Sequence, residues 1–209
     1  MTDFGKLPLD GFLSAVASEA PTPGGGTAAA VAGALGAALT EMVAALTLSK
    51  EKFASAHTAM RSISEAARRA REEFSRLARE DSTAYDSVVA ARRLPKETED
   101  QKASRQEAIQ NANRKATEVP MRTARLAATL LSALPELVEK GNPNALSDAG
   151  SAAILLEGAV ESALLNVGIN LPGVSDLVFV GQMQKETAAL QVDSQRLRSQ
   201  IVAAVRKTF

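Results

Sequence analysis

The stretch FASAHTAMRSISEAARRAREEFSRLAREDSTAYDSVVAA, residues 53–91, decides the fold class of this 209-residue chain. Small and apolar residues recur along it at alternating steps of three and four, which is the spacing of one face of an α-helix. The positions between them are mostly charged, as is typical of a solvated outer face. The stretch therefore predicts one long helix that packs against partner helices through a narrow seam. The seam consists of Phe53, Ala56, Met60, Ile63, Ala67, Ala70, Phe74, Leu77, Asp81, Ala84, Val88 and Ala91.

Helical patterns continue on both sides of this stretch. Strand-like alternation is confined to residues 177–180, and no linker rich in Pro, Gly or Ser divides the chain. The sequence thus predicts an all-α protein, an up-and-down bundle of long helices in a single domain over residues 1–209. Several of these helices have more than one apolar face, which an oligomer would cover. Further helices are expected over residues 10–18, 27–48, 102–140 with Pro120 and Pro135 as kinks or breaks, 151–170, and from the end of LPGVSD to residue 206.

Composition excludes several classes of protein. Twenty-four basic and twenty-four acidic residues give a net charge of zero, which argues against a nucleic-acid partner. The chain has no Cys and one His, so neither a disulfide framework nor a metal site has support. The N-terminus lacks the pattern of a signal peptide, and the uncharged residues 20–40 are mostly Ala, Gly, Thr and Pro. We therefore expect a cytoplasmic protein without a membrane span.

Asp81 is the first candidate for chemistry, because every other member of the seam is apolar or Ala. A carboxyl group at such a position is expected to be at least partly buried, and burial raises its pKa. Buried ionisable groups with shifted pKa values cluster at functional sites. The alternative is a structural salt bridge, or a hydrogen bond to the end of a facing helix.

Two loops are candidates for binding. The first, PTPGGGT at residues 21–27, precedes a helix, and its glycines allow backbone N–H groups to converge where the helix dipole favours anions or carbonyl oxygens. The alternative is a tight helix entry with Thr27 as the N-cap. The second, GNPNALSDAG at residues 141–150, carries more Asn, Ser and Asp than one helix start requires, although capping alone is the competing explanation.

The motifs together resemble a known family. They are PTPGGGTAAAVAGALGAALTEMVAALT at residues 21–47, Lys50, EDSTAY at residues 80–85, and GNPNALSDAGSAAILLEGAVESALLNVGINL at residues 141–171. This pattern is similar to the formiminotetrahydrofolate cyclodeaminase family, which includes the deaminase domain of a bifunctional enzyme and stand-alone methenyltetrahydrofolate cyclohydrolases of the serine cycle. Two departures are Ser49, where a Gly often precedes the Lys, and Phe53, where a Tyr is common, so no role of that Tyr hydroxyl carries over.

The resemblance implies an all-α homodimer that acts on a tetrahydrofolate carrying a one-carbon unit, with no metal or other cofactor. We expect methenyltetrahydrofolate hydrolysis rather than ammonia release from formiminotetrahydrofolate, because no formiminotransferase domain is attached. A helical scaffold without activity is a third alternative.

The same resemblance suggests one active site around residues 21–26 and 141–150. Asp81 and Asp148 are its acid and base candidates, with Lys50 as proton donor or electrostatic partner. A structural alternative for Lys50 is a cation at a helix C-terminus. The expected substrate-binding residues are Thr22, Gly24, Gly25, Gly26, Asn142, Asn144 and Ser147.

Overall fold

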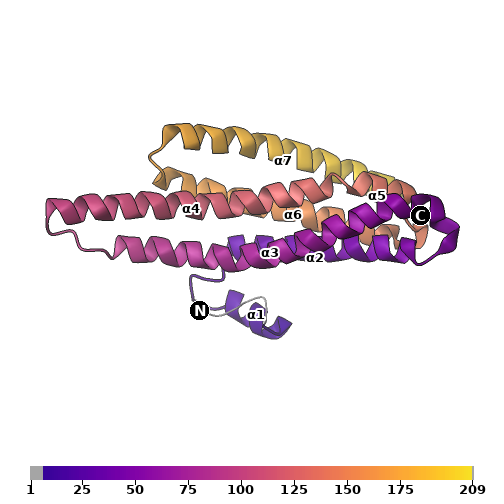
Figure 1. Ribbon diagram of the computed structural model, residues 1–209, viewed down its shortest axis with the longest axis horizontal. Helices are drawn as coiled ribbons and strands as arrows, with labels where there is room; N and C mark the ends of the chain where they lie inside the picture. The colour runs from indigo at the N-terminus through magenta and orange to yellow at the C-terminus, as the bar shows by residue number, and fades with distance from the viewer. Residues whose placement is uncertain (1–6, 209) are drawn as a thin grey trace.

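A computed structural model describes residues 7–208 as an elongated bundle of helices that run up and down along one long axis (Figure 1). The predicted all-α class is therefore confirmed. Short 3-10 turns, η2 (Glu51–Ala56), η3 (Pro143–Ala145) and η4 (Leu171–Gly173), join some of the helices. The helices are α1 (Leu9–Val16), α2 (Gly25–Leu48), α3 (His57–Arg92), α4 (Glu99–Leu131), α5 (Leu134–Lys140), α6 (Leu146–Asn170) and α7 (Leu177–Arg206).

The seam predicted on residues 53–91 is the buried face of α3, which packs against α2 and α4. Its apolar members from Ala56 to Ala91 are buried, except Val88, which is partly exposed. The predicted start is wrong by four residues. Phe53 has non-helical dihedral angles and belongs to η2, so the α-helix begins at His57.

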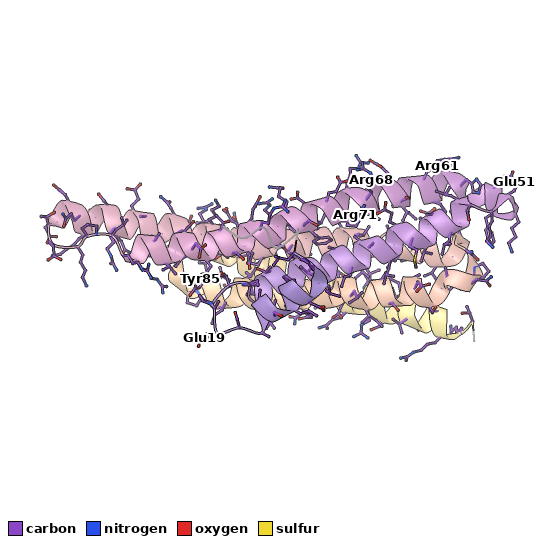
Figure 2. The ribbon with its side chains drawn as sticks, turned by 90° about the horizontal axis from the view of Figure 1, so that it is seen from below. Glu19, Glu51, Arg61, Arg68, Arg71 and Tyr85 are labelled. Carbon is purple, nitrogen blue, oxygen red and sulfur yellow. The ribbon has the colours of Figure 1, made fainter. Side chains whose placement is uncertain are left out.

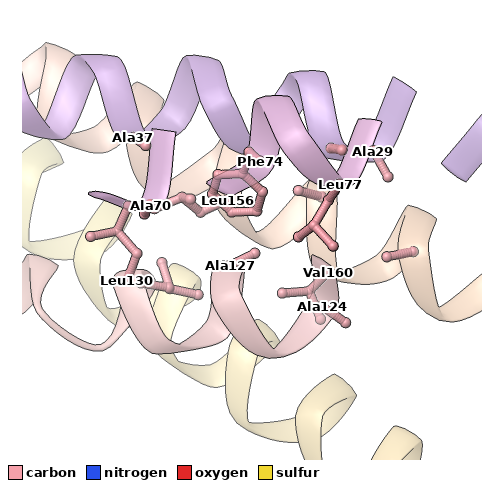
Figure 3. Close-up of a cluster of buried hydrophobic side chains, with 14 of the residues drawn as sticks. Ala29, Ala37, Ala70, Phe74, Leu77, Ala124, Ala127, Leu130, Leu156 and Val160 are labelled. Atoms are coloured by element: carbon pink, nitrogen blue, oxygen red, sulfur yellow. The ribbon is translucent and has the colours of Figure 1, made fainter. Parts of the chain in front are cut away.

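Small residues allow α2 to lie close to its neighbours. A Cβ atom added to Gly33 would lie 2.6 Å from the Phe74 ring of α3, and one added to Gly36 would lie 2.8 Å from Leu156 of α6. Figure 3 shows Phe74 and Leu156 within this core cluster. Because the two large side chains fill the space that the glycines leave, the core is dense despite few aromatic residues.

Helix boundaries differ from the prediction where polar residues precede an apolar run. α2 begins at Gly25 and α6 at Leu146, so Gly25, Gly26, Ser147 and Asp148 lie in first helical turns and not in loops. Residues 177–180, which alternate like a strand, form the first turn of α7, because Asp176 caps it by accepting hydrogen bonds from two backbone N–H groups. Of the two prolines expected to kink or break the helix over residues 102–140, Pro120 lies inside α4 and does not end it, whereas α4 ends at Leu131 and α5 begins at Leu134, beside Pro135.

Candidate active site

A cavity of about 380 Å³ opens beside the start of α2. α2, α3, α4 and α6 all contribute to its wall, together with the segment that leads into α2. Most of its polar groups are backbone or amide groups, with one carboxylate and one guanidinium. The lining residues are Pro21, Thr22, Gly24, Gly25, Gly26, Asp81, Tyr85, Val88, Arg92, Asn113, Ala116, Asn166, Ile169, Asn170 and Gly173.

Asp81 is the carboxylate of this cavity and is partly buried, as its place in the seam predicts. Its Oδ2 accepts a 2.9 Å hydrogen bond from the Thr27 hydroxyl, which lies 3.2 Å from the Ser82 hydroxyl. Burial raises the pKa of Asp81 above its ordinary value, and hydrogen bonds from the Thr27 hydroxyl and backbone N–H offset only part of this. Asp81 is therefore a carboxyl group suited to exchanging a proton closer to neutral pH than an exposed aspartate.

The first turn of α2 is shaped around this carboxyl group. A Cβ atom on Gly26 would lie 2.2 Å from Asp81 Oδ1, so only glycine allows the helix start to approach so closely. The N-cap is Gly24, and the interpretation of Thr27 as N-cap is wrong. Its hydroxyl instead holds Asp81, which links the glycine-rich segment directly to the candidate catalytic group.

Three asparagine amides surround the same cavity. Asn113 donates through Nδ2 to the Gly173 carbonyl at 2.7 Å, and Asn170 donates to the Ala116 carbonyl at 2.7 Å. Asn166 donates to the carbonyl one turn before it on α6 at 2.8 Å. These bonds fix the amide planes and use one of the two N–H donors of each amide, so the Oδ1 atoms can accept hydrogen bonds from a ligand and the second N–H groups can donate hydrogen bonds to it.

The second group of predicted residues lies at the opposite end of α2. The backbone N–H of Asn142 donates to the Thr47 hydroxyl at 2.9 Å, which places residues 141–150 beside the end of that helix. α2 has 24 residues, so its two ends are about 36 Å apart. Figure 2 shows the same separation, with Tyr85 on the cavity side and Glu51, the neighbour of Lys50, at the far end.

One chain therefore brings Asp81 together with Thr22, Gly24, Gly25 and Gly26, but not with the other predicted residues. The single site expected around both loops is not formed within one chain. Asn142 also has a capping role, because its side chain accepts a hydrogen bond from the Asn144 backbone N–H at 3.1 Å. The far-end group consists of Lys50, Asn142, Asn144, Ser147 and Asp148.

Asn113 and Arg92 line the cavity but were not predicted from the sequence. Arg92 is exposed among other charged residues, where no local pattern distinguishes a ligand contact from a solvated side chain, whereas Asn113 is buried beside Ala116 and Thr117 of α4. Asn166 and Asn170 carried a detectable signal, since they are amides four residues apart in an apolar helix.

A partly buried carboxyl group of raised pKa, set in a cavity beside a glycine-lined helix start, is an arrangement typical of enzymes that act on small polar molecules. Comparison with known proteins agrees. The model of the formiminotransferase-cyclodeaminase family matches residues 8–189. The chain therefore belongs to this family, as its motifs predicted.

The similar proteins include enzymes named for two different reactions. A methenyltetrahydrofolate cyclohydrolase of Methylorubrum extorquens is 37% identical over 202 residues, which cover 97% of each protein. A formimidoyltransferase-cyclodeaminase of Sus scrofa is 36% identical over 88% of this chain, which spans only 34% of that protein. The crystal structure of a formiminotetrahydrofolate cyclodeaminase from Thermotoga maritima superposes with a TM-score of 0.86, 32% identity and 97% coverage of both chains.

Proposed function

We propose that this protein hydrolyses 5,10-methenyltetrahydrofolate to 10-formyltetrahydrofolate. The observation that carries the proposal is Asp81, a carboxyl group of raised pKa at the wall of the cavity beside the first turn of α2. The relative from Methylorubrum extorquens, which matches over nearly its full length, is named for this reaction. The second candidate is release of ammonia from formiminotetrahydrofolate, which the name of the Thermotoga maritima structure favours.

The chemistry matches the charge of the cavity. The methenyl carbon of the substrate lies between N5 and N10 in a cationic amidinium, which a carboxylate stabilises and attracts. Ionised Asp81 accepts a proton from water while the water oxygen bonds to that carbon. The bond to N5 then breaks, N5 takes up a proton from the protonated carboxyl group, and the formyl group stays on N10. The second water proton is released, and the route uses no metal or other cofactor.

The segment before α2 is proposed to hold the folate. Thr22 and Gly24 line the cavity ahead of the helix, and Gly25 and Gly26 form its first turn. The N–H groups of a first turn have no partner within their helix, so those of Gly25 and Gly26 are available to the carbonyl and ring nitrogen acceptors of a pterin, while that of Thr27 donates to Asp81.

We further propose a homodimer that forms through the outward faces of α2 and α6. Exposed apolar side chains run along both helices, among them Leu35 and Met42 on α2 and Leu165 and Ile169 on α6. Leu165 is 73% and Ile169 is 77% exposed, which is costly unless another surface covers them. Gly158 on α6 has no atom within 4 Å of a Cβ position, so a second chain has room to approach there.

Acidic side chains of α2 and α6 pair with α3 and α7 and not with groups on the proposed dimer face. On α2, Glu41 pairs with Arg71 of α3 at 3.0 Å. On α6, Glu157 lies 3.6 Å from Arg198 of α7, and Glu161 accepts hydrogen bonds from two α7 glutamines. By length and composition alone, α2 and the α6 region are apolar enough to cross a membrane, a test that core helices of soluble proteins also pass. We propose that the core and the dimer account for this apolar character, without a membrane.

A dimer of this kind also explains the two separated groups of predicted residues. α2 and α6 are antiparallel neighbours, since Asn166 lies beside Gly25 and Asn142 beside Thr47. A two-fold axis perpendicular to the helices would place the far end of each chain over the cavity of the other. Lys50 and Asp148 of the partner subunit would then face Asp81, with Asn142, Asn144 and Ser147 of the partner subunit nearby.

Mixing inactive variants tests this arrangement. Asp81→Asn and Lys50→Ala are each expected to be inactive alone. After subunit exchange about a quarter of wild-type activity should return, because half of the dimers are mixed and each mixed dimer has one intact site. Asp81→Asn mixed with Gly26→Ala is the matched control, since both changes damage the same end and no intact site can form. Activity that stays at the level of the separate variants contradicts the shared site.

The reaction itself is tested by following the absorbance of 5,10-methenyltetrahydrofolate, which disappears on ring opening. A parallel assay with 5-formiminotetrahydrofolate follows ammonia. Loss of absorbance above the uncatalysed rate, without ammonia from the formimino compound, supports the hydrolase, whereas ammonia release supports the deaminase. A cytoplasmic location, a place in the serine cycle and the absence of a nucleic-acid partner are predictions consistent with a folate enzyme of zero net charge.

A further inference from the structure

One face of α3 presents a series of different chemical groups to the cavity. Asp81, Tyr85, Val88 and Arg92 follow one another at steps of four, three and four, so they lie in one row along the helix. All four line the cavity. In order, the row offers a carboxylate, an aromatic ring, an aliphatic group and a guanidinium.

The C-terminal end of this row carries a positive charge. Arg92 is the one cation among the cavity's lining residues. Its backbone carbonyl accepts hydrogen bonds from Arg105 Nε at 3.3 Å and Nη2 at 3.0 Å, so a second guanidinium is held beside it. An anionic group at this end of the cavity would meet the guanidinium of Arg92, whereas Arg105 lines a separate hollow at the connection between α3 and α4.

We infer that folate lies along α3 with its one-carbon centre at Asp81, its p-aminobenzoyl ring beside Tyr85 and Val88, and its glutamate carboxylates at Arg92. This inference rests on the proposed function and assigns the direction of the substrate within the site. The groups on the helix complement the groups of the substrate in the same order: the carboxylate faces the cationic centre, the aromatic and aliphatic side chains face the aromatic ring, and the guanidinium faces the glutamate dianion.

The dimensions agree with this direction. Eleven residues separate Asp81 from Arg92, a rise of about 16 Å along the helix axis. Helical side chains lean toward the N-terminus, so the long Arg92 side chain reaches back toward Asp81. From the methenyl carbon to the glutamate carboxylates, standard bond lengths give roughly 12 Å for an extended folate. The reverse direction would place the neutral pterin at the guanidinium and the glutamate anions at the carboxylate.

Arg92→Gln tests the inference, because it removes the charge but keeps a long polar side chain. The KM for methenyltetrahydrofolate is expected to rise about tenfold or more, since a charge-assisted hydrogen bond to a carboxylate is lost, while kcat changes little. The matched substrate is the bis-amide of methenyltetrahydrofolate, in which both glutamate carboxylates are amides. With this substrate, Arg92→Gln and the wild type should have the same KM.

Arg93→Gln is the matched control variant. It removes a neighbouring exposed cation that is not among the lining residues, and both KM values should stay at the wild-type level. Arg92→Lys should restore part of the affinity for the acid but not for the bis-amide. The inference is overturned if Arg92→Gln raises both KM values equally, lowers kcat instead, or behaves like Arg93→Gln.

Calorimetric binding of 5-formyltetrahydrofolate and of its bis-amide separates this inference from the proposed reaction. A wild-type protein that binds the acid more tightly than the bis-amide, with the difference lost in Arg92→Gln, supports the direction even if no turnover is found. Equal binding of the acid and the bis-amide by the wild type, or no binding of either, overturns it.

Discussion

The hydrogen bond from Thr27 to Asp81 allows a quantitative test of the role of the carboxyl group. Thr27 is buried, and its hydroxyl lies 2.9 Å from Asp81 Oδ2. Thr27→Val keeps the shape of the side chain and removes the donor. Hydrogen bonds to charged groups contribute about 1.5–3 kcal/mol, and one pKa unit corresponds to about 1.4 kcal/mol. The pKa of Asp81, already raised by burial, should therefore rise by a further one to two units, approximately.

The assay is the pH dependence of kcat/KM for methenyltetrahydrofolate, corrected for the uncatalysed reaction at each pH. If ionised Asp81 accepts the proton from water, activity falls as the pH drops through its pKa. The acid limb should then move to higher pH in Thr27→Val by the same one to two units, approximately. Thr27→Ser, which keeps the hydroxyl, should show a much smaller shift. An unmoved acid limb in a folded Thr27→Val protein would refute the assignment of Asp81 as the base.

Four further variants test the packing of the glycines and the burial of the same carboxyl group. Gly26→Ala should lower kcat by about a hundredfold or more with the helical circular dichroism retained, because its Cβ would lie 2.2 Å from Asp81 Oδ1 and displace it; near-normal turnover would contradict the contact. Gly33→Ala should lower the free energy of unfolding by about 1–3 kcal/mol, since its Cβ would lie 2.6 Å from the Phe74 ring. In contrast, Gly181→Ala on α7, with no atom within 4 Å, should raise it by about 0.5–1 kcal/mol, and urea unfolding measures both. Asp81→Asn should stabilise the protein more at neutral pH than near about pH 4. Burial raises the pKa of Asp81 in the folded state, so the free energy of unfolding of the wild type falls as the pH rises from the unfolded-state pKa through the folded-state pKa. Urea unfolding that gives an equal difference between the two proteins at both pH values would contradict this.

Local periodicity explains why much of the fold could be predicted from the sequence. The buried face of α3 repeats every three or four residues, so it identifies both the helix and the residues that contact its partners. Asp81 stood out because a carboxyl group interrupts an otherwise apolar series, and the structure places it in the cavity wall. The glycines before α2 could be linked to a site, but not to a particular atom. Their contact with Asp81 joins residues more than fifty positions apart.

The relation between the two polar segments could not be predicted from local patterns. Residues 21–26 and 141–150 both precede apolar helices, and each resembles half of one site. Their placement at opposite ends depends on α2 and α6 lying antiparallel, which is set by contacts between distant parts of the chain. Arg92 likewise has no local signal, since many arginines occupy solvated helical faces. Its place in the cavity follows only from the way α3 lies along it.

The most direct test of the account is the rate at which 5,10-methenyltetrahydrofolate loses its absorbance with the wild-type protein and with Asp81→Asn, compared at one pH and matched for fold by circular dichroism. The account predicts rapid loss with the wild type and at least about a hundredfold slower loss with Asp81→Asn, the range expected when a general base is removed. Equal rates for the two folded proteins, or no loss above the uncatalysed rate with the wild type, would contradict it.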